Sequence, residues 1–277
     1  MSISVSYGSG YAWDVSVSQE GLPAMQATDI DDVLEKLGQI IEHYRERHSP
    51  LAFFPAVYRA TTARVRAGIR SGAFADAARM NRLATVFANR YLAAFDVAET
   101  AGGGRRARAW QVAFDAGARS HTMILQHVLV GMNAHINFDL PLAVIAAAAG
   151  GTVAEIEQDF KAINQILAAL LDPVQDVIDG FSPLLGILDQ VGGRTDEALV
   201  TFSINNARDE AWHEATRLAL EPAEQRERSI LCLDRRVTLL AERIILPDGP
   251  LGLASNLIAR TESRDVPAIT AALRALV

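Results

Sequence analysis

The stretch His127-Val-Leu-Val-Gly-Met-Asn-Ala-His-Ile-Asn-Phe-Asp-Leu-Pro141 places five polar side chains in one of the most apolar parts of the chain. Within it, Asn133, His135, Asn137 and Asp139 alternate strictly with apolar residues. In an extended segment, all four side chains would line one wall. In a helix, residues four apart share a face, so His135 and Asp139 would separate from Asn133 and Asn137. The geometry of this stretch therefore decides which polar groups act together.

Pro141 indicates where the helix that carries these residues should end. Proline disfavours helical geometry in the residue before it, so we expect this helix to stop at Asp139 or Leu140. The polar residues would then lie at a helix end, and at most one of the two pairs would face a pocket.

Outward from this stretch, apolar residues recur at helical spacing over most of the chain. Asp29 is suited to cap the first helix, and Thr152 with Glu155 forms a capping box. The sequence predicts helices over residues 29–48, 55–70, 75–99, 105–137 with a break near Gly117, 140–149, 152 onward with an interruption at Asp172-Pro173, 195–220 and 222–245, followed by a turn at 247–250 and a short closing helix.

These segments predict an all-α fold, an irregular multi-helix bundle of nine to ten helices. Residues 1–28 mix glycine, serine and valine and are predicted to form an extended N-terminal arm. Residues 29–277 are expected to form a single helical domain, because no Pro/Ser-rich linker or low-complexity tract divides them. A hydrophobic share of 50% is sufficient for a sizeable core.

The composition excludes several classes of function. A net charge of −7 with scattered basic residues predicts no binding to nucleic acid. Cys232 is the only cysteine, which rules out an internal disulfide. The most apolar run, residues 140–151, is shorter than the roughly 20 residues of a membrane helix, so no membrane span is expected. Residues 1–20 lack a signal-peptide pattern, which favours a cytoplasmic location, and a homo-oligomer is left open.

His135 and Asp139 are the leading candidates for catalysis, with His127 as a third. A carboxylate beside an imidazole fixes its tautomer and raises its basicity, as proton transfer requires. The same residues, with His213 from another helix, could instead hold a divalent metal such as Zn, Fe or Mn. His127 and His135 are roughly 12 Å apart along a regular helix, so one ion reaches both only if the helix unwinds after Gly131.

Further polar and aromatic side chains are candidates for binding a substrate, although packing in the core is the alternative for each aromatic one. Asn133 and Asn137 could orient a substrate or could serve as a buried hydrogen-bond network between helices. The other substrate-binding candidates are Tyr58, Tyr91, Trp110, Arg208 and Trp212.

The central stretch also carries a resemblance to a known family. Residues 126–127 and 131–140, Gln-His and Gly-Met-Asn-Ala-His-Ile-Asn-Phe-Asp-Leu, form its signature, and the similarity continues at residues 74–76, 110–114 and 208–212. On these residues the chain resembles an uncharacterised, mostly bacterial family of all-helical proteins that is described only as a domain of unknown function. The resemblance implies a helical fold and the location of a site, and it brings no activity.

Three functions fit the sequence. The first is an enzyme acting on a small, largely apolar molecule by acid/base or metal-assisted chemistry, through hydrolysis, elimination or cyclisation. The second is a non-catalytic protein that binds a lipid-like or terpenoid-like molecule in a helical cavity. The third is a structural protein in which the polar residues form a buried network.

Overall fold

The computed structural model describes residues 25–100, 106–148, 151–188 and 204–276. Within these residues the protein is helical throughout and contains no strand, as predicted. They hold ten helices when the continuous helix Ile124–Ala147 is counted once, in agreement with the nine to ten expected. Residues 1–24 of the predicted arm and the predicted helix start at Thr195 lie outside the described residues.

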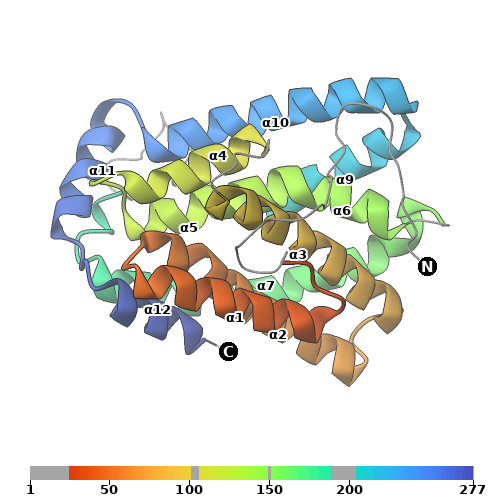
Figure 1. The fold of residues 1–277 in the computed structure, drawn as a ribbon, viewed down its shortest axis with the longest axis horizontal. Helices are drawn as coiled ribbons and strands as arrows, with labels where there is room; N and C mark the ends of the chain where they lie inside the picture. The colour runs from red at the N-terminus through yellow and green to blue at the C-terminus, as the bar shows by residue number, and fades with distance from the viewer. Residues whose placement is uncertain (1–24, 101–105, 149–150, 189–203, 277) are drawn as a thin grey trace.

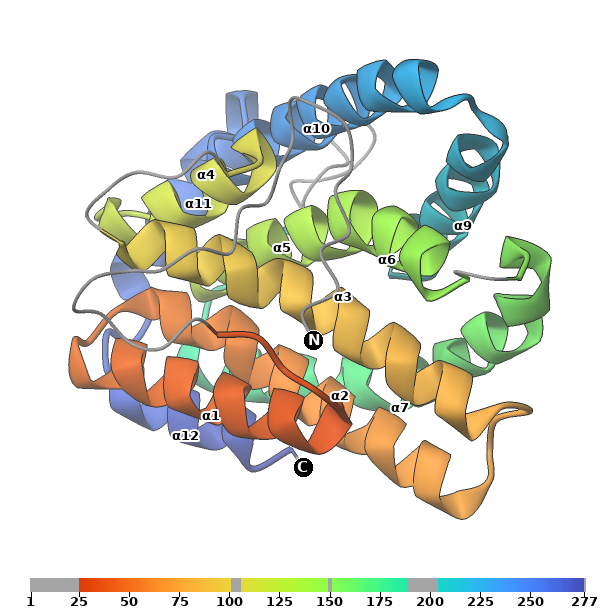
Figure 2. The same ribbon diagram turned by 45° about the vertical axis from the view of Figure 1, so that its right-hand side comes forward.

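The helices form a bundle around a central helix. In Figures 1 and 2, α5 and α6 run through the middle of the molecule, with α10 on one side and α1, α2 and α12 on the other. The helices are α1 (Ile30–Glu46), α2 (Phe53–Ser71), α3 (Ala77–Glu99), α4 (Arg108–Asp115), α5 (Ile124–Asn133), α6 (Leu140–Ala147), α7 (Glu157–Phe181), α9 (Ile204–Leu220), α10 (Ala223–Ile245), α11 (Gly249–Thr261) and α12 (Val266–Arg274).

The ends of the first helices follow from local chemistry. The side chain of Asp29 accepts a hydrogen bond from the backbone N–H of Asp32 at 2.9 Å and caps α1 as predicted. α2 ends at Ser71 and is followed by Gly72, whose φ of 75° lies in the left-handed region that glycine adopts without strain. The predicted break near Gly117 is present, because α4 ends at Asp115 and a short 3₁₀ turn follows over Ala116–Ala118.

The predicted helix end before Pro141 is wrong. The central helix continues from Ile124 to Ala147, and residues Ala134–Asp139 form a π-helical segment within it. The backbone N–H of Leu140 donates to the carbonyl of His135, five residues back. An α-helical turn would press the proline ring against the carbonyl four residues back, and the wider π turn relieves that clash.

The predicted interruption at Asp172-Pro173 is also wrong, because α7 runs through Pro173. Proline removes one backbone hydrogen bond, at a cost of about 3 kcal/mol. Apolar packing on both sides of the proline offsets this cost: Phe160 and Ile163 are buried before it, and Ile178 is buried after it. The structure also has two helices, α11 and α12, where one short closing helix was predicted, and α11 begins at residue 249 inside the predicted turn.

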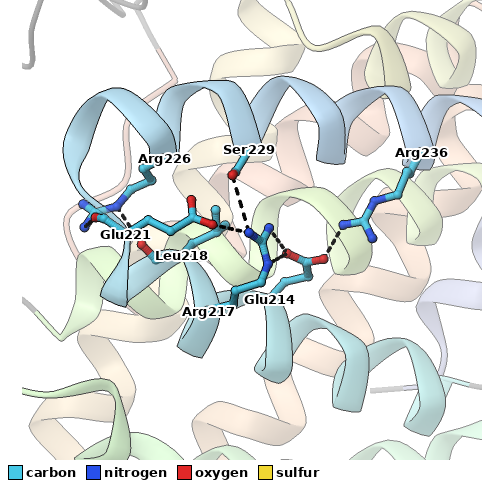
Figure 3. A network of polar contacts seen from close by, with 7 residues as sticks. All are labelled: Glu214, Arg217, Leu218, Glu221, Arg226, Ser229 and Arg236. Carbon is cyan, nitrogen blue, oxygen red and sulfur yellow. Dashed lines mark hydrogen bonds and ion pairs between the residues drawn. The ribbon is translucent and has the colours of Figure 1, made fainter.

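A polar network fixes the α9–α10 hairpin (Figure 3). Glu214 accepts a hydrogen bond from Arg217 of the same helix at 2.7 Å. It also forms an ion pair with Arg236 of α10. Arg226 donates to the carbonyl of Leu218 at 2.8 Å and so satisfies the C-terminal end of α9. The Glu214–Arg236 ion pair and the Arg226–Leu218 hydrogen bond thus connect the two helices.

The central helix is longer than the apolar run considered in the sequence analysis. At 24 residues, Ile124–Ala147 is long and apolar enough to cross a membrane by length and composition. The sequence analysis considered only a shorter apolar run, because it ended the helix at Pro141. In the folded protein, 72% of the most apolar window of this helix is buried, so its apolar surface packs mainly against the other helices.

Gly131 brings α2 close to the central helix. A Cβ atom added at Gly131 would lie 2.4 Å from Cγ of Phe54, a distance that requires the ring or the helix to move. The Phe54 ring thus fills the space beside Gly131.

We expect Gly131→Ala to destabilise the protein by about 1–3 kcal/mol, the usual cost of overpacking a close-packed core. Urea unfolding followed by circular dichroism measures the loss. Gly180→Ala in α7 is the matched control, because no atom lies within 4 Å of its added Cβ and alanine favours helix there. Equal stability of the two variants would contradict the close approach of Phe54.

Candidate functional site

Asp139 is the centre of a buried polar cluster formed by three helical elements. Its Oδ1 atom accepts a hydrogen bond from Nε of Arg90 in α3 at 3.1 Å. Its Oδ2 atom accepts from Nε1 of Trp110 in α4 at 2.9 Å and lies 3.2 Å from Nδ1 of His135. The residue is only 2% exposed, so the positive charge of Arg90 and these donors replace the water that the carboxylate loses.

His135 lies against Asp139 and inside a cluster of aromatic rings. Its ring stacks on Phe87 with a centroid distance of 3.6 Å and an interplanar angle of 6°. Tyr58 meets it edge-on at 4.5 Å. The ring centroids of three further aromatic residues lie between 5.9 and 6.2 Å from it: Phe54, Tyr91 and Trp110.

The state of the His135 imidazole follows from its surroundings. Burial lowers the pKa of His135, although the Asp139 carboxylate acts in the opposite direction. An ionised carboxylate can only accept hydrogen bonds, so Nδ1 of His135 must be the protonated nitrogen. Nε2 is then the basic nitrogen, and it is buried without a hydrogen-bond partner in the described part of the chain.

Asn133 and Asn137 form a separate pair, as the helical interpretation predicted. Nδ2 of Asn137 donates to Oδ1 of Asn133 at 2.9 Å, and Nδ2 of Asn133 donates to the carbonyl of Val237 in α10 at 3.0 Å. Neither asparagine lines the cavity described below. The two side chains thus form a hydrogen-bond network between the central helix and α10.

A cavity of about 760 Å³ lies beside His135. Its walls come from α2, α3, the central helix, α7 and α9, and they are mainly apolar. Exposed side chains of α7 belong to its rim, so the cavity reaches the surface there; these are Asp172, Gln175 and Asp179. Of the predicted site residues, only Tyr58, His135 and Arg208 line this cavity.

The remaining predicted residues fall around the cavity without lining it. Tyr91 and Trp110 pack in the aromatic cluster behind His135. Trp212 packs on Phe160, with ring centroids 4.9 Å apart. The sequence analysis missed most of the wall, because apolar residues on amphipathic helices carry no chemical signal of a cavity; examples are Met80, Leu83, Phe87, Ile163 and Leu167.

The predicted metal site is not formed by the described residues. No three His, Cys, Asp or Glu side chains among them gather in a way that could hold an ion. His127 is buried near Phe53, where loss of water lowers its pKa to about 4, and His213 is exposed on α9. Both oxygens of Asp139 are already engaged by donors, and the helix does not unwind between the two histidines.

The fold and the site define an all-helical bundle protein with an apolar cavity beside a buried histidine–aspartate pair. Residues 30–247 match a family described as a family of unknown function, DUF5995, and the chain belongs to this family. A comparison with curated proteins found no match, and neither did a comparison with solved structures.

We expect Asp139→Asn to reduce stability by about 3 kcal/mol, the lower end of the cost of removing one partner of a buried ion pair. The lower end applies because Arg90 is 22% exposed and water can solvate its charge once the carboxylate is gone. Urea unfolding measures the loss. Adding Arg90→Met to this variant should cost less than the sum of the two single changes, and strict additivity would contradict the coupling.

Proposed function

We propose that the protein binds a small, largely apolar molecule in the cavity beside His135, where His135 serves as a polar contact. The observation that carries this proposal is the cavity itself, because close-packed interiors leave few voids larger than a water molecule. A volume of about 760 Å³ falls within the range of known small-molecule sites, which span roughly 300–1,000 Å³.

The character of the walls supports an apolar guest. The lining is dominated by aliphatic and aromatic side chains, with few polar groups at defined places. Binding of an apolar molecule against such a lining is favourable by about 25 cal/mol for each Å² of apolar surface removed from water. The few polar groups then orient the molecule; those inside the cavity include Tyr58, Thr62, His135 and Arg208.

A substitution that fills the cavity tests this proposal. Ala84 lies on α3 in the wall of the cavity, and Ala84→Phe would occupy part of its volume. We expect the wild type to bind the neutral dye Nile red at one saturable site, and Ala84→Phe to weaken binding by about tenfold or more, equivalent to about 1.4 kcal/mol. Fluorescence titration measures both dissociation constants.

Ala78→Phe is the matched control, because Ala78 is exposed on the same helix and does not line the cavity. Its affinity for Nile red should stay within about twofold of the wild type. The proposal fails if the dye does not saturate, or if Ala84→Phe binds it as tightly as Ala78→Phe does.

A second candidate function, acid–base catalysis on the bound molecule, is favoured by one specific observation. His135 combines a carboxylate partner at Nδ1 with a buried Nε2 that has no partner in the described residues. This arrangement suits a general base, since the carboxylate orients the ring and stabilises the imidazolium that forms on proton transfer. The reaction would be hydrolysis, elimination or cyclisation, according to the molecule bound.

The tautomer of His135 tests the catalytic candidate. We expect ¹⁵N NMR of the imidazole to show a neutral ring at pH 7 with the proton on Nδ1, because burial lowers the pKa of His135 and Asp139 can only accept. The His135→Gln variant assigns the signals. A ring protonated on Nε2 at pH 7 would have no basic nitrogen available there and would exclude this role.

A further inference from the structure

Arg208 is a buried cation whose hydrogen-bond partners are neutral. It is 4% exposed, its Nε atom donates to Oδ1 of Asn164 at 2.6 Å, and its Nη2 atom donates to the carbonyl of Phe160 at 2.6 Å. The guanidinium also lies over the Phe160 ring, 4.1 Å from its centroid. Within the described residues, it forms no ion pair with an aspartate or glutamate.

Two other arginines show how this protein normally places a guanidinium inside the bundle. Arg79 pairs with the buried Asp159 at 3.1 Å, and Arg90 pairs with the buried Asp139 at 3.1 Å. Arg208 is more deeply buried than either, yet it has no such partner among the described residues. Among the described residues, Asp209 attracts Arg208 only through space, without forming an ion pair with it. A buried charge that lacks an ion-paired partner is costly, so a bound anion would stabilise it.

The charge of Arg208 is present at neutral pH. Burial lowers the pKa of Arg208 to about 10, which still leaves the guanidinium protonated at pH 7. The neutral oxygens of Asn164 and Phe160 fix the orientation of the guanidinium without neutralising it. Among the described residues, only the Nε and Nη2 atoms of the guanidinium have hydrogen-bond acceptors.

Arg208 lies in the cavity wall next to the first part of α7. Phe160 and Asn164, which hold it, precede the rim residue Asp172 by 12 and 8 positions, or roughly 12–18 Å along the helix. The wall between Asn164 and Asp172 is apolar and includes Leu167, Leu170 and Leu171. The cavity therefore carries a positive charge near one end, followed by an apolar surface along α7.

We infer that the cavity takes an amphipathic monocarboxylic acid, whose carboxylate pairs with Arg208 and whose apolar body lies along α7. This inference rests on the proposed function and specifies the class of ligand. A single guanidinium matches one negative charge, and guanidinium–carboxylate pairs are among the strongest hydrogen-bonded pairs in proteins. Exposed Asp172 and Asp179 at the rim would repel a carboxylate placed there and so favour the inward orientation.

Calorimetric titration with matched probes tests the inference. Tetradecanoic acid and tetradecan-1-ol have the same apolar chain and differ in the charge of the head group. We expect the wild type to bind the acid at least about tenfold more tightly than the alcohol, because a hydrogen bond to a charged group contributes about 1.5–3 kcal/mol. This comparison uses the wild-type protein alone, so it does not depend on the folding of any variant.

Arg208→Met should remove the preference by weakening acid binding about tenfold while the affinity for the alcohol changes by less than about twofold. Arg226→Met is the matched control, because Arg226 likewise donates to neutral oxygens, the backbone carbonyls at the end of α9, and does not line the cavity. Thermal unfolding establishes that both variants are folded.

The outcomes distinguish the two proposals. Equal affinities for acid and alcohol in the wild type would overturn the inference and leave the apolar cavity as the binding site. Tighter binding of tetradecyl phosphate than of the acid would overturn the carboxylate assignment. Binding of none of the three probes, together with no saturable Nile red site, would overturn the proposed function itself.

Discussion

The buried carboxylate of Asp139 is the constraint on which the middle of the bundle depends. A carboxylate that is 2% exposed must be matched by donors, and here they come from Arg90 of α3, Trp110 of α4 and His135 of the central helix. Because the carboxylate can only accept, this one group sets the position of two neighbouring helices and the tautomer of the imidazole. Packing and site chemistry are thus linked through a single side chain.

The π-helical segment makes this arrangement compatible with an uninterrupted central helix. Residues Ala134–Asp139 carry both His135 and Asp139, and the wider turn also accommodates Pro141 directly behind them. π-helical turns occur frequently at functional sites, which fits the concentration of polar groups in this segment. Asn133 links the same segment to α10 through its hydrogen bond to Val237, and it accepts a hydrogen bond from Asn137.

The cavity depends on elements that are distant in the sequence. α7 and α9 contribute part of its wall, and the Glu214–Arg236 ion pair seen in Figure 3 links α9 to α10. Arg208 contributes a buried guanidinium to the cavity wall, and its partners Asn164 and Phe160 come from α7. The polar and apolar parts of the cavity are therefore assembled by packing between helices.

The helical class, most helix boundaries and the separation of the His135–Asp139 pair from the asparagine pair were predictable from the sequence, because they depend on periodicity, capping and spacing within one segment. The continuation of the helices through Pro141 and Pro173 could be seen only in the folded protein, because a π turn accommodates Pro141 and apolar packing on both sides offsets the local cost of Pro173. The tertiary structure also decided which side chains surround the cavity. Phe87 and Arg208 meet the same space as His135 only because three helices converge there, and spacing along the chain does not encode that convergence.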